Sequence, residues 1–282
     1  MIKDGSGLRR APFLRRYNPD QVHECNLRPY RPPRKLNINV SDMVVIRQAP
    51  YHNILMSIKD NWKLFQENLE ETAADCKRDA DSITVMAVSK TRSVEEIIKA
   101  YSSGLRIFGE NRVEEASEKF TKLDPDKYPL YLIGHLQSNK VSNINHRYTA
   151  VHSVDSLKLA RRLSHFRESI NSPLEILLQV NTSGESSKSG FHKLDSLSET
   201  AAQIAQMPYL KLRGLMTMAP FVDDETIVRS CFSLCREWSE SIKTSIEGVP
   251  VLSMGMSSDY KWAVAEGSTM LRIGTTLFGG RE

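Results

Sequence analysis

The stretch ITVMAVSK, residues 83–90, is a run of apolar and β-branched residues that ends on a lysine. An apolar run of this length predicts a strand that is buried on both faces, as strands of parallel sheets are. A helix is predicted to follow from Ser93, because Glu96 can complete a capping box with it and Gly104 can end that helix. The stretch therefore predicts a strand–helix unit with Lys90 at the carboxyl end of the strand.

The same pattern of a short strand followed by a helix recurs along the rest of the chain. The further strand candidates are residues 106–108, 130–133, 150–153, 174–180, 212–216, 251–252 and 270–273. Eight strands that alternate with helices over roughly 200 residues favour a closed (β/α)8 TIM barrel of the α/β class. An open, doubly wound sheet is the alternative, because eight parallel strands can also remain open.

An extra helix is expected before the first strand, and a disordered leader is expected before that helix. The apolar positions at helical spacing are Ile54, Leu55, Ile58, Trp62, Phe65, Leu69 and Ala73. Residues 1–52 contain Pro and Arg clusters such as RPYRPPRK and little apolar periodicity, which predicts a disordered basic leader. We therefore expect the leader at 1–52 and a single barrel domain at 53–282. Met56 is an alternative start of translation.

Charge and hydropathy limit the kinds of partner. Residues 1–55 hold ten Lys and Arg against four Asp and Glu, a balance of +6, so the total of +4 leaves −2 for residues 56–282. A nearly neutral body gives no electrostatic support for nucleic-acid binding. No apolar run is long enough to span a bilayer, so we expect a cytoplasmic protein without membrane contact. The Arg-rich leader leaves organellar targeting as an alternative, although Ser is scarce there.

Lys90 is the first candidate for chemistry. A buried strand is not expected to end on a strongly hydrated cation without a reason. Partial desolvation lowers the pKa of a lysine and favours an uncharged amine, which can form an imine with a carbonyl compound. A solvated lysine at a strand exit is the plain structural alternative. The four cysteines form no Cys-x-x-Cys pair and have no nearby His at ligand spacing, so no metal site is expected.

Two turns near the end of the chain suit a phosphate group. SMGMSS (253–258) and RIGTT (272–276) follow the seventh and eighth predicted strands, where TIM barrels often bind phosphate. Hydroxyls, helix N-terminal amides and glycine suit a dianion, which points to Ser257, Gly274 and Thr275, although plain helix caps are the alternative. Closing the barrel would place them within one small molecule's length of the strand-one lysine. This combination indicates pyridoxal phosphate or a sugar phosphate bound as a Schiff base.

Arg272 is expected at the inward-facing end of the eighth strand. From there its guanidinium could reach a ring nitrogen of a bound cofactor. A permanent cation at that position would keep a pyridine nitrogen unprotonated and would weaken the ring as an electron sink. An ion pair across the mouth of the barrel is the structural alternative.

Six segments spread over about residues 56–282 carry a family pattern: AVSKTRSVEEIIKAY, FGENRVEEA, IGHLQSNKV, LQVNTSGE, LRGLMTM and LSMGMSSDYKWAVAEGSTMLRIGTTLFG. In these segments and in their order the chain resembles the pyridoxal phosphate homeostasis family (YggS/PROSC). The resemblance implies one barrel, similar to the N-terminal domain of alanine racemase, that carries pyridoxal 5'-phosphate as an internal aldimine. The site residues that it implies are Lys90 for the aldimine, Arg272 for the pyridine nitrogen, Ser257, Gly274 and Thr275 for the phosphate, and Asn111 and His135 for the pocket wall.

Some positions remain open or depart from the family. Asn111 is equally interpretable as a helix cap, and His135 as an ordinary polar residue. Leu130-Tyr131-Leu132 stands where the family usually has Trp-His-Phe, which is expected to change packing on the third strand and not the cofactor contacts. Residues 1–55 have no counterpart in the family pattern.

The resemblance implies a carrier or buffer of pyridoxal phosphate that supplies apo-enzymes, expected to be a monomer. A racemase-type enzyme is the first alternative. In alanine racemases the second catalytic base comes from a separate C-terminal domain, and none is expected here because the chain ends nine residues after Ile273. Slow side reactions of the aldimine with amines are still expected. A Schiff-base aldolase acting on a sugar phosphate is the alternative from outside the family.

Overall fold

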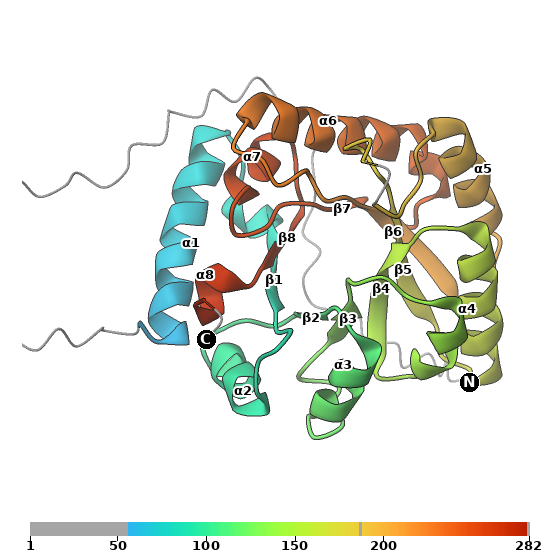
Figure 1. Ribbon diagram of the computed structural model, residues 1–282, viewed down its shortest axis with the longest axis horizontal. Helices are drawn as coiled ribbons and strands as arrows, with labels where there is room; N and C mark the ends of the chain where they lie inside the picture. Colours follow the sequence, from blue (N-terminus) through green and yellow to red (C-terminus); the bar gives the residue numbers. More distant parts are fainter. Residues whose placement is uncertain (1–55, 186–187, 281–282) are drawn as a thin grey trace, which may run out of the picture.

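The computed structural model describes residues 56–185 and 188–280. Its parallel strands form a closed barrel in the order β1 to β8, with β8 paired to β1 (Figure 1). The strands are β1 (Thr84–Val88), β2 (Phe108–Glu110), β3 (Leu130–Leu132), β4 (Tyr148–Val154), β5 (Leu174–Gln179), β6 (Leu210–Met216), β7 (Val251–Ser253) and β8 (Met270–Ile273). The predicted TIM barrel is confirmed, and the open sheet is excluded.

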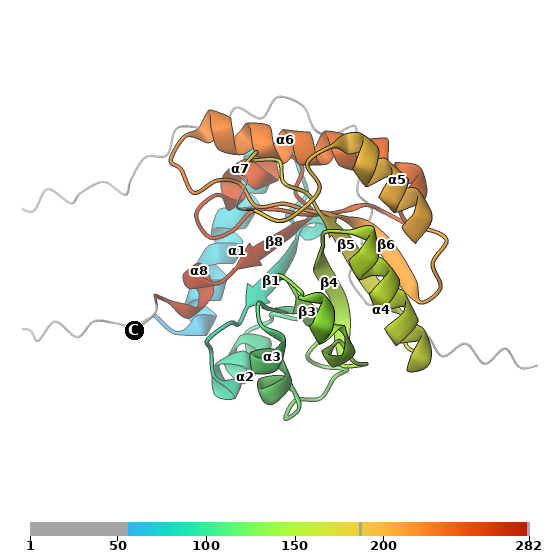
Figure 2. The ribbon, with the colours of Figure 1, turned by 45° about the vertical axis from the view of Figure 1, so that its right-hand side comes forward.

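Helices surround the barrel, as the two views in Figures 1 and 2 show. The α-helices are α1 (Ile58–Asp75), α2 (Val94–Ser102), α3 (Val113–Phe120), α4 (Leu157–Ser169), α5 (Leu194–Ile204), α6 (Glu225–Ser241), α7 (Tyr260–Ala265) and α8 (Thr275–Phe278). The 3-10 helices are η3 (Ala80–Ser82), η4 (Ser138–Asn143) and η5 (Lys243–Ser245). The connection between β3 and β4 is therefore a 3-10 segment in place of an α-helix.

Local capping signals in the sequence set the starts of the first two helices. Ser57 and Asp60 form a capping box at α1, and Ser93 and Glu96 form the predicted one at α2. Gly104 follows α2 with a φ of 115°, which a glycine adopts without steric cost. The prediction of a strand–helix unit around residues 83–104 is confirmed.

Helix α1 is the expected extra helix, and it covers the outside of the barrel beside α7 and α8 (Figure 1). Its buried face includes Phe65, whose ring centroid lies 5.0 Å from that of Tyr260 on α7. The Asn61 side chain donates to the Leu277 carbonyl on α8 at 3.0 Å. Helix α1 thus supports the two short helices that follow β7 and β8. The predicted leader lies outside the described residues.

The core has two parts, one inside the barrel and one between the strands and the helices. The buried side chains inside the barrel are Met86, Tyr131, Ala150, Leu177, Met216, Val251 and Met270. Gly109 makes room for this filling, because a Cβ built there would lie 2.5 Å from the Met86 sulfur. Burying each large apolar side chain contributes about 1.5–3 kcal/mol. The interior is therefore packed, and chemistry is confined to the ends of the strands.

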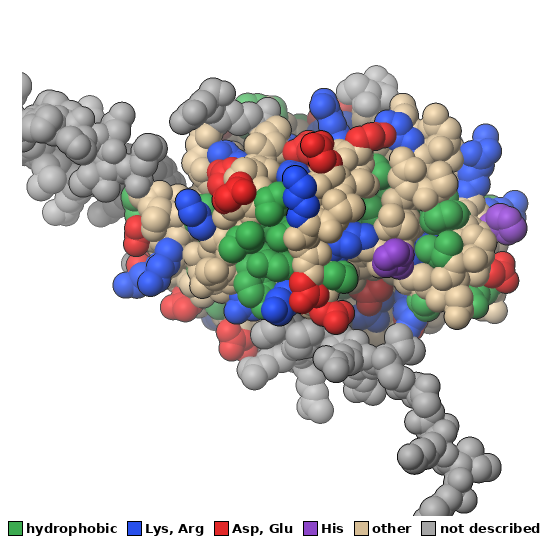
Figure 3. Space-filling view, turned by 90° about the horizontal axis from the view of Figure 1, so that it is seen from below, with side chains coloured by type: hydrophobic (Ala, Val, Ile, Leu, Met, Phe, Trp, Pro, Cys, Tyr) green, Lys and Arg blue, Asp and Glu red, His purple; other side chains and the backbone are tan. Residues whose placement is uncertain are grey.

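The surface seen in Figure 3 carries Lys and Arg side chains interspersed with Asp and Glu. This mixture agrees with the nearly neutral charge of the body. Across residues 56–185 and 188–280, no helix combines the length and the apolar character that crossing a membrane requires.

Candidate functional site

Pairing of β1 with β8 brings the predicted lysine and the predicted phosphate turn together. Ala87 is in register with Ile273, so both strands end at the same level of the barrel. A Cβ built on Gly274 would lie 3.5 Å from the Cβ and the carbonyl oxygen of Val88. Lys90 follows two residues later and is half-buried. The carboxyl ends of the first and last strands therefore meet where the sequence predicts the site.

The two glycine- and serine-containing turns also contact each other. The hydroxyl of Ser257 accepts a hydrogen bond from the amide of Thr276 at 3.3 Å. Ser257 and Gly274 are half-buried, and Thr275 is exposed. The structure thus brings all three predicted phosphate residues to one place. Hydroxyls beside a glycine at the start of a helix are groups that can bind a phosphate dianion.

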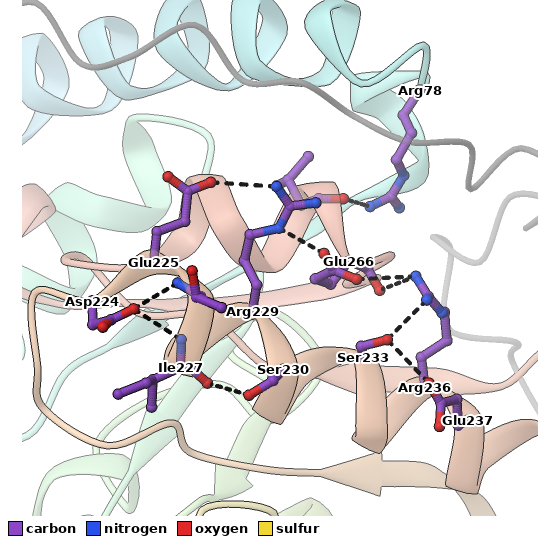
Figure 4. Close-up of polar contacts among 12 residues, drawn as sticks. Arg78, Asp224, Glu225, Ile227, Arg229, Ser230, Ser233, Arg236, Glu237 and Glu266 are labelled. Atoms are coloured by element: carbon purple, nitrogen blue, oxygen red, sulfur yellow. Dashed lines mark hydrogen bonds and ion pairs between the residues drawn. The ribbon is translucent and has the colours of Figure 1, made fainter.

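Helix α7, which follows the first of these turns, is held from outside by ion pairs. Glu266, at the end of α7, accepts from Arg229 at 2.7 Å and from Arg236 at 3.3 Å, both on α6 (Figure 4). Arg78, which follows α1, donates to the Val264 carbonyl at 2.8 Å. These contacts fix the position of α7 and hence of the turn that contains Ser257.

Arg272 lies buried between the ends of β6, β7 and β8. Its guanidinium donates to the Ser253 carbonyl, to the Ser253 hydroxyl at 2.9 Å and to the Thr217 carbonyl at 2.8 Å. Burial lowers the pKa of Arg272 to about 10, so the side chain remains charged at neutral pH. Its contacts within the described ranges are these hydrogen bonds to Ser253 and Thr217, and not the ion pair across the barrel mouth that the sequence left as an alternative. The charge of the buried Asp259 acts on the guanidinium and partly offsets the effect of burial. A buried cation with no carboxylate at ion-pair distance suits a ligand that brings negative charge or a lone pair.

Asn111 and His135 lie at the ends of β2 and β3. Asn111 is half-buried, and a Cβ on Gly134 would lie 2.1 Å from its carbonyl oxygen, so the two strand ends touch. The N-cap of α3 is Arg112, without a side-chain hydrogen bond, so the interpretation of Asn111 as the cap is wrong. His135 is 57% exposed, and its Nδ1 lies 3.6 Å from Asp155. His135 therefore lies at the rim.

Tyr131 and His152 are interior residues that the sequence did not indicate as part of the site. Tyr131, expected to alter packing only, lies inside the barrel with its ring edge-on to His152 at 5.3 Å between centroids. Burial, together with the nearby Arg272, lowers the pKa of His152 to about 3. A neutral imidazole therefore lies close to the buried guanidinium. The alternation of side chains along β4 could have indicated that His152 points inward, had the strand bounds been known.

A second cluster that sequence reasoning missed lies beside Lys90. Lys119 on α3 forms ion pairs with Glu110 at 2.7 Å and with Glu115 at 2.9 Å. Ser89 donates its hydroxyl to Glu110 at 2.7 Å. The one signal in the sequence was the spacing of Glu115 and Lys119, which are four apart on a helix.

Comparisons with known proteins agree with this geometry. The family model described as "Alanine racemase, N-terminal domain" matches residues 57–282. Relatives named "Pyridoxal phosphate homeostasis protein" include one from Pasteurella multocida, 37% identical over 231 residues, which spans 80% of this chain and 99% of the relative. The protein of that name from Escherichia coli is 38% identical over 231 residues, and the match spans 80% of this chain and 97% of that relative.

Solved structures give the same result. PipY of Synechococcus elongatus with pyridoxal phosphate (PLP) bound is 32% identical, with a TM-score of 0.68 over 79% of this chain and 100% of that chain. An alanine racemase from Clostridium difficile is 15% identical, with a TM-score of 0.66 over 79% of this chain and 57% of that chain. The second likeness concerns the fold alone.

Proposed function

Since this chain belongs to the alanine racemase N-terminal domain family and to the pyridoxal phosphate homeostasis proteins, we propose that it binds pyridoxal 5'-phosphate and acts in its homeostasis. The observation that carries the proposal is the register of β1 with β8. It brings a half-buried lysine, a serine–glycine–threonine cradle and a buried arginine to one end of a barrel. These groups suit an aldehyde, a phosphate and a pyridine nitrogen, respectively.

Each residue has a defined role in this proposal. The cofactor, when bound, supplies an aldehyde that condenses with a primary amine. Lys90 would provide that amine, and Ser257, Gly274 and Thr275 would hold the phosphate. Arg272 would donate to the ring nitrogen from a fixed position, since three hydrogen bonds already orient its guanidinium. Asn111 would line the wall beside the cofactor.

We propose a carrier or buffer that delivers the cofactor to apo-enzymes, and not an efficient enzyme. Arg272 supports this choice, because a charged guanidinium beside the ring nitrogen disfavours protonation of the ring and weakens it as an electron sink. The alternative is a racemase-type enzyme, and the match to the family model described as "Alanine racemase, N-terminal domain" is the observation behind it. Exchange of the alanine α-proton in deuterated water separates the two. We expect a rate near that of free cofactor, far below the ~10 s⁻¹ typical of enzymes.

The direct test uses purified protein before and after borohydride reduction. We expect an absorption band of the lysine-bound cofactor, and a mass increase that peptide mapping assigns to Lys90. Lys90→Ala should remove both and keep the circular dichroism of the fold, because a half-buried strand-end side chain contributes little to the core. Lys99→Ala, at an exposed position of α2, is the matched control. A label that persists in Lys90→Ala would show the assignment to be wrong. A sugar phosphate trapped on Lys90 in its place would favour the aldolase.

The monomeric state and the transfer to apo-enzymes are parts of this proposal, which sedimentation and transfer assays would test. The predicted cytoplasmic location, and targeting by the leader as its alternative, stay predictions.

A further inference from the structure

The backbone on both sides of Lys90 is bound to one cluster of charged side chains. On the near side, Lys119 donates to the Ser89 carbonyl at 2.9 Å, and the Ser89 hydroxyl donates to Glu110 at 2.7 Å. On the far side, the Thr91 amide donates to Glu115 at 2.5 Å. Lys119 joins the two sides, because it is ion-paired with both carboxylates.

The Glu110 side of this cluster is shielded from water, and the Glu115 side is partly exposed, with the Glu115 side chain 28% exposed. Glu110 is fully buried, and the Lys119 side chain is 12% exposed. Burial raises the pKa of Glu110, although Lys119 and Ser89 oppose the shift. Burial also acts on Glu115, but hydrogen bonds from Lys119 and the Thr91 amide outweigh it and lower the pKa of that carboxyl. Hydrogen bonds to charged groups are stronger than neutral ones, and those of Lys119 and Ser89 to Glu110 are also buried, so the cluster can hold the backbone on both sides of Lys90.

Thr91 needs an anchor of this kind. Its φ is 64°, in the left-handed region that β-branched residues rarely adopt. A conformation of this sort persists only where surrounding contacts hold it. The hydrogen bond to Glu115 holds the residue that follows Lys90, so the turn formed by Lys90 and Thr91 depends on the cluster.

From these contacts we propose that Lys119 is a positioning residue for cofactor attachment. In this proposal it acts through the backbone beside Lys90 and not through a contact with the cofactor. With Glu110 and Glu115 it fixes Ser89 and Thr91, and thereby sets the place of the Lys90 amine at the carboxyl end of β1. This inference rests on the proposed role of Lys90, and it explains why an attachment lysine on a strand exit can be held in one place before the cofactor arrives.

The test compares Lys119→Met with Lys140→Met in the full-length protein. Met keeps most of the side-chain volume of Lys and removes the charge. Lys140 also pairs with a glutamate of α3, Glu114 at 2.6 Å, but it contacts neither neighbour of Lys90, so it controls for loss of an ion pair. Glu115→Ala is a second variant, which removes the Thr91 contact if Lys119→Met does not fold. The probe is pyridoxal 5'-phosphate, and cofactor-free protein is measured alongside.

Three readouts distinguish positioning from general stability. For Lys119→Met and Glu115→Ala we expect faster amide hydrogen exchange at Thr91 in the cofactor-free protein. We also expect cofactor affinity to fall by roughly tenfold, as loss of one charged hydrogen bond would produce. The pH midpoint of the Lys90 absorption band should shift. Lys140→Met should match the wild type in all three.

Several outcomes would overturn the inference. Both variants could match the wild type in exchange, affinity and pH midpoint. They could lower only the melting temperature, which would show a purely structural role. Borohydride could label Lys119, which would make it the attachment residue. Failure of the proposed function looks different, because then the wild type itself carries no label on Lys90.

Discussion

Acidification should destabilise the barrel through His152, a residue of strand β4 that is 2% exposed. Its Nδ1 has no hydrogen-bond partner among the described residues, and its ring packs on Tyr131. Burial and the charge of Arg272 hold its pKa at about 3, against 6.5 for a free histidine. Between these two values the unfolded chain binds a proton that the folded protein does not. The stability that His152 contributes is therefore complete above pH 6.5 and decreases as the pH falls toward 3.

The size of the effect follows from proton linkage. A pH of 5 lies about 1.5 units below the pKa of the histidine in the unfolded chain. Since each unit corresponds to about 1.4 kcal/mol, the free energy of unfolding is about 2 kcal/mol lower at pH 5 than at pH 7. At pH 3 the loss is about 4 kcal/mol. Carboxylates also titrate in this range, so the informative quantity is the difference between the wild type and a variant without the imidazole.

The assay is urea unfolding of the cofactor-free protein at pH 7 and pH 5, followed by circular dichroism. The wild type should lose about 2 kcal/mol more than His152→Gln between the two pH values. His165→Gln, at an exposed position of α4, is the control and should behave as the wild type. Equal losses in the wild type and His152→Gln would refute the reasoning, since they would mean that His152 binds its proton equally in both states.

Two further predictions concern a turn and the leader. Gly255→Ala should lower the free energy of unfolding by about 3 kcal/mol, because its φ is 97° and a Cβ would lie 2.6 Å from that of Ala263. Gly279→Ala, at a φ of 84° with nothing within 4 Å of the added Cβ, should cost only about 1 kcal/mol; equal losses in urea titrations would contradict the steric argument. Residues 56–282 alone should bind pyridoxal phosphate as tightly as the full chain, and a large loss of affinity in a binding titration would show that residues 1–55 contribute to the domain.

Lys119 and His152 show where sequence reasoning stopped. A lysine four residues after a glutamate on a helix predicts a surface pair, and only the packing of α3 against β1 and β2 makes Lys119 the centre of a buried cluster. For His152, the sequence did not show whether the side chain faces the inside of the barrel or the surrounding helices. The sequence left Asn111 open as a cap of α3, and the structure places the cap at Arg112, because a difference of one residue at a helix start changes no periodicity.

The sequence by itself determined the alternation of strands and helices, the capping box at Ser93 and the place of Lys90 after a buried strand. These features follow from local periodicity and from hydrogen bonds between residues three or four apart. Only the tertiary structure decided that β8 pairs with β1, because both an open and a closed sheet satisfy the same local pattern. That pairing joins residues 186 positions apart, such as Ala87 and Ile273, and places Gly274 against Val88. It therefore decides which separate turns become one site.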